Sequence, residues 1–452
     1  MLHQFINRAG ELKALEDRFR GQNPEFIIIY GRRRVGKTEL VTHFMKGRPC
    51  IYYLCGEKKY KDNLNDMKEA AADFLKDEEF RMLAFENWAQ MFKSIVSRIS
   101  ERTVIIIDEF PYLVEEDKSI PSEFQKIWDM HISKSENIML ILVGSSVSMM
   151  EKLLAQKSPL FGRRTAQLEI KPLDIFLAGE FLPEYSMEDR IIAYGCLDGI
   201  PLYLKQFSSE RPVFDNMREA FFRRDALLYN EAEILLKQEF REPSNYFAIL
   251  KAISYGYTKQ NEIADYTDID KSIISKYMKN LEEIRIIRKE YPVTDRKEKR
   301  KNTRYAFIDN YFRFWFRFIY SGRTLIESSP KDAFDIMKKN YNQYLGYIFE
   351  KTAEEFLLKK RPVKFTKLGR WWHKDAEIDL VALNEDTKEI IFCECKWQDK
   401  VDAGKILSEL KEKSKYVDWN NGKRNEYYAL FAKSFREKIK EPNVMLFDLA
   451  DF

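Results

Sequence analysis

Residues 26–38 read Phe26-Ile27-Ile28-Ile29-Tyr30-Gly31-Arg32-Arg33-Arg34-Val35-Gly36-Lys37-Thr38. The first five form a continuous apolar run, which is typical of a strand buried on both faces of a parallel sheet. The last eight match the pattern G-x-x-x-x-G-K-[ST], and a helical stretch at 39–45 follows directly. Strand, glycine-containing loop and helix in this order are the context of a phosphate-binding loop; the alternative is a glycine turn beside a surface lysine. We therefore predict an α/β fold built around a phosphate site.

The loop supplies the groups that a nucleotide polyphosphate needs. Its glycines let backbone N–H groups point toward phosphate oxygens. Lys37 is expected to neutralise the β- and γ-phosphates, with no other cation placed for that task, and the Thr38 hydroxyl to ligate Mg²⁺. The predicted nucleotide contacts are Gly31, Arg32, Arg33, Arg34, Val35, Gly36, Lys37, Thr38 and Glu39.

A second buried run ends in two carboxylates, Val104-Ile105-Ile106-Ile107-Asp108-Glu109. Beside a phosphate loop, Asp108 is expected to hold the Mg²⁺ shell, and Glu109 to orient and deprotonate the attacking water. An acidic strand end can also be a solvated edge without chemistry, but its pairing with the phosphate loop favours the catalytic interpretation. A third apolar run, Ile138-Met139-Leu140-Ile141-Leu142-Val143, fits the same parallel sheet.

Composition limits the class of protein. The 452 residues correspond to about three domains, and 45% hydrophobic with 33% charged residues exclude a disordered or fibrous chain. A net charge of +4 leaves nucleic-acid binding open, so any basic surface must be local. Five irregularly spaced cysteines indicate a reducing compartment. Because no secretory leader and no apolar stretch of ~20 residues are evident, we expect a cytoplasmic protein without a membrane span.

Further motifs accompany the phosphate loop. They are Phe5-Ile6-Asn7-Arg8 with Glu11-Leu12, Ile107-Asp108-Glu109-Phe110-Pro111-Tyr112-Leu113, Gly144-Ser145-Ser146, Leu160-Phe161-Gly162-Arg163-Arg164 and Gly199-Ile200-Pro201-Leu202-Tyr203-Leu204. In this order they resemble the AAA+/STAND-type P-loop ATPases of the archaeal ATPase family. Asn7 replaces the glycine that this family carries at the same place.

The resemblance implies ATP as the nucleotide, Mg²⁺ as its cofactor and ATP hydrolysis as the reaction. It places Ser145 or Ser146 as the sensor of the γ-phosphate or attacking water, and the Gly199-Ile200-Pro201 turn as the reporter of the nucleotide state to a helical lid. Arg163 and Arg164 are candidates for an arginine finger that stabilises the transferring phosphoryl group; the alternative is an ordinary charged loop. We expect a homo-oligomer.

The middle of the chain has a pattern of three helices and two strands. Helices are expected near 246–250, 261–266 and 271–284, and strands at 286–291 and 304–308. The pattern resembles a winged helix-turn-helix, whose third helix enters the major groove while the wing contacts the DNA backbone. DNA is therefore the expected partner, through the basic wing residues Arg296, Lys297, Lys299, Arg300 and Lys301. The alternative is a module that only packs against the ATPase core. The aromatic run at 311–316 is expected in a core rather than as a base-stacking platform.

Acidic residues and a lysine recur at strand spacing near the C-terminus. Glu377-Ile378-Asp379-Leu380-Val381 and Ile390-Ile391-Phe392-Cys393-Glu394-Cys395-Lys396-Trp397 are predicted strands, and Glu350 lies on the helix before them. Because side chains alternate along a strand, Glu394 and Lys396 share one face. The ordered set resembles the PD-(D/E)XK restriction-endonuclease-like fold. Asp379, Glu394 and Glu350 are then expected as metal ligands and Lys396 as the group that activates water; the alternative is a surface salt-bridge cluster.

Four domains are predicted from these patterns: a P-loop AAA+-type ATPase core at 1–171, a helical lid at 172–240, a winged helix at 241–322 and a nuclease-like α/β domain at 323–452. Three functions are compatible with them. The first is an ATP-regulated DNA nuclease, the second an ATP-dependent switch that binds DNA or a partner without cleaving it, and the third a signalling scaffold whose ATPase governs assembly. The carboxylate–lysine set favours the first.

Overall fold

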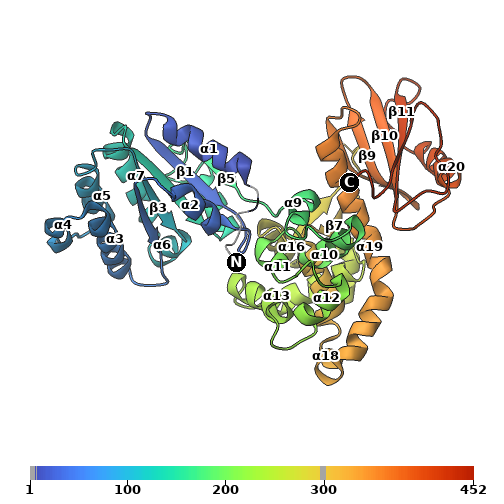
Figure 1. Ribbon diagram of the computed structural model, residues 1–452, viewed down its shortest axis with the longest axis horizontal. Coiled ribbons are helices and arrows are strands. Elements are labelled where there is room, and N and C mark those ends of the chain that lie inside the picture. Colours follow the sequence, from blue (N-terminus) through green and yellow to red (C-terminus); the bar gives the residue numbers. More distant parts are fainter. Residues whose placement is uncertain (1–5, 7, 296–301) are drawn as a thin grey trace. The chain divides into compact units, whose positions relative to one another are not determined.

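Two compact units make up the chain (Figure 1). The computed structural model describes residues 6, 8–295 and 302–452. We call residues 1–172 the N-terminal unit and residues 173–452 the C-terminal unit, and describe each by itself. The predicted division into four domains stays a prediction. The basic residues expected in the wing, Arg296, Lys297, Lys299, Arg300 and Lys301, lie outside the described residues.

The N-terminal unit contains a five-stranded parallel sheet in the order β2-β3-β4-β1-β5. Its strands are β1 (Glu25–Tyr30), β2 (Cys50–Leu54), β3 (Thr103–Asp108), β4 (Ile138–Gly144) and β5 (Ala166–Glu169). Its helices are α1 (Ala9–Arg20), α2 (Lys37–Met45), α3 (Tyr60–Leu75), α4 (Glu78–Met82), α5 (Trp88–Val96), α6 (Pro111–Glu116), α7 (Ile120–Met130) and α8 (Val147–Leu154), with a 3-10 turn, η1 (Ile132–Lys134).

Burial explains why these strands lie at the centre. Every residue of β1, β3 and β4 is buried, so side chains on both faces of the sheet are covered. On one face, Phe26 of β1 shares a core with Trp88 of α5 and Phe124 of α7. Parallel strands end at a common edge of their sheet, and β3, β4 and β1 are neighbours. The loops that follow these three strands therefore meet at one edge.

The C-terminal unit begins with helices. They are α9 (Ile175–Gly179), α10 (Met187–Leu197), α11 (Pro201–Leu204), α12 (Val213–Phe221), α13 (Leu227–Glu239), α14 (Ser244–Ser254), α15 (Gln260–Thr267) and α16 (Ile274–Glu283), followed by the antiparallel pair β6 (Ile287–Glu290) and β7 (Arg304–Phe307). The third helix of the predicted module starts at Ile274 and not at residue 271. Asp270 first forms a turn, in which its carboxylate accepts from the Ser272 N–H at 2.6 Å and its carbonyl from the Ile274 N–H at 3.1 Å.

The aromatic run after β7 belongs to the core. It forms α17 (Asn310–Phe314) and a π-helical turn, η3 (Trp315–Tyr320), and α18 (Arg323–Ser328) follows. Tyr311 and Trp315 are fully buried, and the Trp315 indole N–H donates to the carbonyl oxygen of Tyr229 at 2.7 Å. This confirms the prediction that the run packs in a core.

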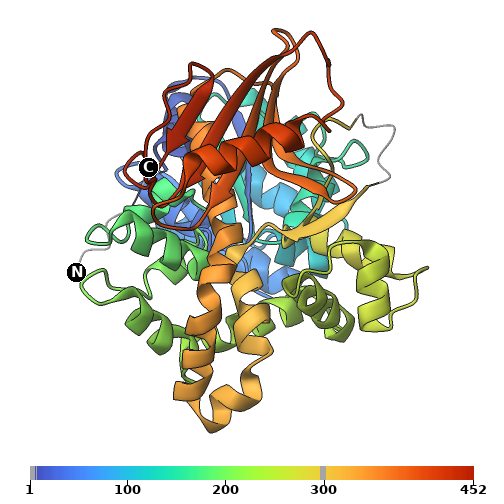
Figure 2. The ribbon, with the colours of Figure 1, turned by 90° about the vertical axis from the view of Figure 1, so that its right-hand side faces the viewer.

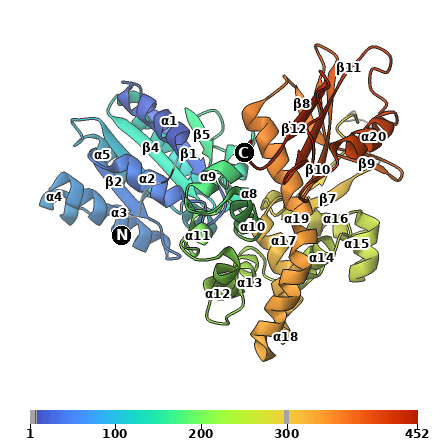
Figure 3. The ribbon, with the colours of Figure 1, turned by 45° about the vertical axis from the view of Figure 1, so that its right-hand side comes forward.

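A long helix leads into a second sheet. It is α19 (Pro330–Lys360), which contacts α18 and α10 and then β9 and β10 (Figure 3). The mixed sheet has the order β12-β11-β10-β9-β8, formed by β8 (Lys367–His373), β9 (Ala376–Asn384), β10 (Glu389–Lys396), β11 (Asn425–Ala432) and β12 (Val444–Phe447). Helix α20 (Ala403–Ser414) lies across this sheet (Figure 2). Neither α19 nor any other described helix is long and apolar enough to cross a membrane.

Candidate functional site

The loop after β1 turns sharply at two glycines. Gly31 and Gly36 have φ angles of 158° and 92°. A Cβ at Gly31 would lie 2.2 Å from the carbonyl oxygen of Ile170, a separation that no side chain tolerates. Gly36 precedes α2 in the left-handed region that favours glycine. The loop therefore presents the N-terminus of α2, with its backbone N–H groups, at the carboxyl edge of the sheet.

Lys37 is folded into this loop. Its Nζ donates to the carbonyl oxygens of Gly31 and Arg32, at 2.9 and 2.8 Å, and the residue is buried. Burial lowers the pKa of Lys37 to about 8; the carboxylates of Glu109 and Asp108 oppose this shift, whereas Arg33 and Arg32 add to it. The positive charges of the Arg32 and Arg33 guanidinium groups therefore repel the Lys37 ammonium group. Lys37 therefore has two cationic neighbours in the loop, and its place as the main cation at the phosphates stays a prediction.

Asp108, the last residue of β3, is fully buried and reaches the loop. Its Oδ2 accepts from the Thr38 hydroxyl at 2.9 Å and from the Tyr52 hydroxyl of β2 at 3.0 Å. The Thr38 hydroxyl and the Asp108 carboxylate are hard oxygen donors, so the residues present fit Mg²⁺. Burial raises the pKa of Tyr52, which keeps this phenol a neutral donor. Tyr52 lies on a strand and belongs to no motif, so the sequence analysis did not predict its contact with Asp108.

Glu109 and Ser145 are brought into direct contact. Glu109 has a φ of 53°, which is uncommon for a residue other than glycine. Its carboxylate accepts a hydrogen bond from the hydroxyl of Ser145, the residue that follows the neighbouring strand β4. Ser146 instead occupies the N-cap position of α8, where its side chain makes no capping bond. Of the two serines predicted as sensor, Ser145 is therefore the one joined to Glu109.

Arg8 connects the loop to the end of the N-terminal unit. Its buried guanidinium donates to the carbonyl oxygens of Val35 and Lys171, at 3.0 and 2.8 Å, and pairs with Glu11 at 3.1 Å. Val35 belongs to the phosphate loop, and Lys171 precedes the last residue of the unit. The motif around Arg8 is visible in the sequence, but this tie between distant backbone groups is visible only in the structure.

The two arginines proposed as an arginine finger are engaged within their own unit. Arg163 pairs with Asp129 of α7 at 3.0 Å. Arg164 donates to the carbonyl oxygen of Leu154 at 3.3 Å. Neither of these bonds involves the phosphate loop, and the side chain of Arg163 is 30% exposed.

In the C-terminal unit, the turn at Gly199 requires glycine. A Cβ there would lie 1.8 Å from the carbonyl oxygen of Leu173, whose N–H donates to the Gly199 carbonyl at 2.8 Å. The preceding Asp198 is buried with φ 52° and ψ −163°, a region that is nearly exclusive to glycine. Its carboxylate accepts from the Asn310 N–H at 2.9 Å and lies 3.5 Å from Nζ of Lys351 on α19. The turn is thus tied to α19.

The antiparallel neighbours β9 and β10 bring Asp379, Glu394 and Lys396 together. Asp379 accepts from a backbone N–H of β10 at 2.8 Å. Glu394 accepts from Lys396 at 2.9 Å and from Lys413 of α20 at 2.8 Å. Burial raises the pKa of Asp379 to about 7, and the charges of Glu350 and Glu394 add to this shift. The two strand carboxylates are therefore close enough to influence each other.

The carboxylate of Glu350 belongs to a chain of ion pairs with arginine side chains. It pairs with Arg370 of β8, which also pairs with Glu377 at 2.7 Å, and Glu377 pairs in turn with Arg304 of β7 at 3.0 Å. Among the described residues, no three His, Cys, Asp or Glu side chains are grouped so that they could hold a metal ion. Glu350 nevertheless acts on the strand carboxylates, because its charge and that of Glu394 both raise the pKa of Asp379. The role of the three carboxylates as metal ligands stays a prediction.

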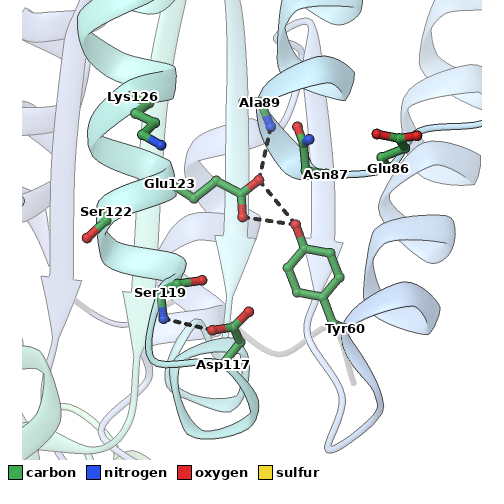
Figure 4. Close-up of a pocket in the computed structure, with 9 residues that line it drawn as sticks. All are labelled: Tyr60, Glu86, Asn87, Ala89, Asp117, Ser119, Ser122, Glu123 and Lys126. Atoms are coloured by element: carbon green, nitrogen blue, oxygen red, sulfur yellow. Dashed lines mark hydrogen bonds between the residues drawn. The ribbon is translucent and has the colours of Figure 1, made fainter.

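A separate hollow in the N-terminal unit has acidic walls (Figure 4). Its volume is about 350 Å³, and its lining includes Glu86, Asp117 and Glu123. Glu123 accepts from the Tyr60 hydroxyl at 2.9 and 3.1 Å and from the Ala89 N–H at 3.4 Å. Its carboxylates repel polyphosphate, so this hollow does not compete with the phosphate loop as a nucleotide site.

Comparisons with known proteins agree with the phosphate site. Residues 5–207 match an ATPase domain found predominantly in Archaea, and residues 315–409 match archaeal and bacterial proteins of unknown function. An uncharacterised protein of Methanocaldococcus jannaschii is 41% identical over 456 residues, which cover 99% of this chain and 100% of the relative. An uncharacterised ATP-binding protein of the same organism is 46% identical over 44 residues, 10% of this chain and 75% of that protein.

A solved structure shows the same fold. It is a Walker-type ATPase of Pyrococcus abyssi, with a TM-score of 0.51 and 21% identity over 70% of this chain and 97% of that one. The P-loop ATPase fold predicted from the sequence is thereby confirmed. One relative thus matches this chain from end to end, and an ATPase domain matches the residues around the phosphate loop. The chain belongs to the archaeal ATPase family.

Proposed function

We propose that ATP binding and hydrolysis in the N-terminal unit control the action of the C-terminal unit on DNA. The observation that carries the first half is the joined set of Thr38, Asp108, Glu109 and Ser145 beside the phosphate loop. The second half is supported by the run from α14 to β7, which has the element order of a winged helix, and by the carboxylate–lysine group on β9 and β10.

Each residue of the phosphate site has a distinct task in this proposal. Backbone N–H groups of the loop bind the ATP phosphates, and Lys37, assisted by Arg32 and Arg33, neutralises them. Thr38 and Asp108 would hold Mg²⁺, which screens the phosphate charge when bound. Glu109 accepts the proton of the attacking water, and the Ser145 hydroxyl fixes the position of that carboxylate.

The arginine finger would act between copies of the chain. Arg163 and Arg164 bond within their own unit away from the phosphate loop, so a second copy is the natural recipient of one of them. Arg163 is partly exposed, and it would have to exchange its ion pair with Asp129 and its bonds to the carbonyl oxygens of Pro159 and Phe161. The proposal therefore includes a homo-oligomer.

Coupling to DNA is tested with the full-length protein. Because linkage between two binding sites is reciprocal, duplex DNA is expected to change the ATP affinity by about 5–150-fold. The measurement is a titration of labelled ATP with and without duplex DNA, with a sulfated polysaccharide as the control polyanion. Unchanged ATP affinity in the presence of bound DNA would leave an ATPase without coupling and contradict the proposal.

A second candidate function, metal-dependent DNA cleavage, is favoured by Asp379, Glu394 and Lys396. Two carboxylates and substrate oxygens suffice for Mg²⁺, which supplies phosphate polarisation when bound. The residues fit this ion in part, because Glu394 already pairs with two lysines and Glu350 with Arg370. Lys396 is the residue that would stabilise the developing charge. Burial alone would lower its pKa, but its hydrogen bond with Glu394 raises it and keeps the amine protonated.

Loss of cleavage in Asp379→Ala and Lys396→Ala is the expected result. Each should reduce Mg²⁺- or Mn²⁺-dependent nicking of supercoiled plasmid by at least ~10²-fold, while ATP hydrolysis persists. The matched controls are Asp375→Ala and Lys405→Ala, which change exposed residues of the same unit. Full cleavage by both site variants, or cleavage by the wild type in excess EDTA, would remove nuclease activity from this site.

A further inference from the structure

A groove in the C-terminal unit lies where three elements meet. It has a volume of about 700 Å³, and its walls come from the start of α15, the start of β7 and the end of β8 with the turn that follows. Its lining includes Lys259, Arg304, Trp372, His373 and Lys374, with side-chain amides and a hydroxyl between them. We call it the basic groove.

The charge of the basic groove is one-sided. Of the described residues that line it, none is acidic, although the chain has 72 acidic residues against 76 Lys and Arg residues. The carboxylates that pair with Lys259 and Arg304 at 3.0 Å, those of Glu262 and Glu377, are outside the lining. A hollow lined by one sign of charge concentrates the potential inside it. A polyanion is therefore the class of ligand that this groove attracts.

The polar groups of the groove suit a sugar–phosphate backbone better than bases. Trp372 is buried, and the Arg304 guanidinium lies 4.5 Å from the centre of its ring, so this indole is not available to stack on a base. In the described part of the chain, the buried Nε of Arg304 has no hydrogen-bond acceptor. Lysine, amide and hydroxyl donors are the groups that contact phosphate and sugar in protein–DNA interfaces.

We infer that the basic groove binds the phosphodiester backbone of DNA. The inference rests on the proposed action on DNA and adds the place where a strand is held. A strand seated there contacts the helical module through α15 and β7 and the second sheet through β8. It also contacts the first member of the ion-pair chain Arg304–Glu377–Arg370–Glu350, whose last carboxylate influences Asp379.

The test is the salt dependence of DNA binding by the full-length double variant Lys259→Gln/Lys374→Gln. Each lost phosphate contact lowers the slope of log K against log salt by about 0.9, so the slope should fall by about 2. Binding of a labelled duplex should weaken by about 10- to 50-fold at about 0.15 M salt. Fluorescence anisotropy at several salt concentrations measures both quantities.

A matched double variant, Lys405→Gln/Lys438→Gln, removes the same charge from exposed positions outside the groove lining. It should keep the wild-type slope, and the ATPase rates and melting temperatures of both variants verify their folding. Equal losses in the two variants, or an unchanged slope in the groove variant, would overturn the groove assignment alone. Absence of DNA binding by the wild type would overturn the proposed action on DNA as well. Inorganic polyphosphate that competes as tightly as duplex DNA would overturn DNA as the ligand.

Discussion

Lys37→Ala is expected to abolish ATP hydrolysis and to weaken ATP binding by at least ~10²-fold. The Lys37 ammonium is buried inside the phosphate loop, where a charge interacts with phosphate far more strongly than it does in water. Its removal also leaves the carbonyls of Gly31 and Arg32 without their shared donor. Calorimetric titration with ATP and a phosphate-release assay measure the two effects.

A second expected result concerns Arg32 and Arg33, the cationic neighbours of Lys37. Because both act on the Lys37 charge, residual ATP binding in Lys37→Ala should decline further when either arginine is also replaced by alanine. The control is Lys13→Ala, which alters an exposed lysine of α1. Near-wild-type ATP affinity in Lys37→Ala would show that the phosphates do not bind at this loop.

Glu109→Gln is expected to keep ATP bound while hydrolysis slows by about 10²–10⁴-fold. The glutamine side chain can still accept the Ser145 hydrogen bond, so the geometry at the end of β3 is retained, but it cannot take a proton from water. ATP affinity and single-turnover hydrolysis, measured on the same preparation, separate the two effects. Glu101→Gln changes an exposed carboxylate near the start of β3 and serves as the control. Hydrolysis at the wild-type rate would exclude Glu109 as the base.

Much of the sheet in the N-terminal unit can be predicted because burial on both faces leaves a clear pattern. β1, β3 and β4 are continuous apolar runs. The edge strands β2 and β5 are only partly buried and do not form such runs. In the C-terminal unit, β9 and β10 could be predicted from their apolar residues around the acidic positions, whereas the following α20, β11 and β12 carry no motif that orders them. Spacing along the chain thus predicts central strands better than edges.

The candidate site shows the same limit. Motif spacing predicts the residues at the ends of β1, β3 and β4, since the sheet brings those loops together. Tyr52 and Lys413 reach Asp108 and Glu394 from other elements, and no local pattern indicates such contacts. The ion pair between Arg370 and Glu350 is a third contact of this kind.

Two adjacent residues of α19 point to different partners. Lys351 faces the strained turn at Asp198, while Glu350 pairs with Arg370 of the sheet. Successive residues of an α-helix are about 100° apart around its axis, and the 31 residues of α19 span about 46 Å. Glu350 and Lys351 therefore lie on the same turn of α19 and point in different directions. A rotation of α19 that separated Lys351 from Asp198 would therefore also displace Glu350 relative to Arg370.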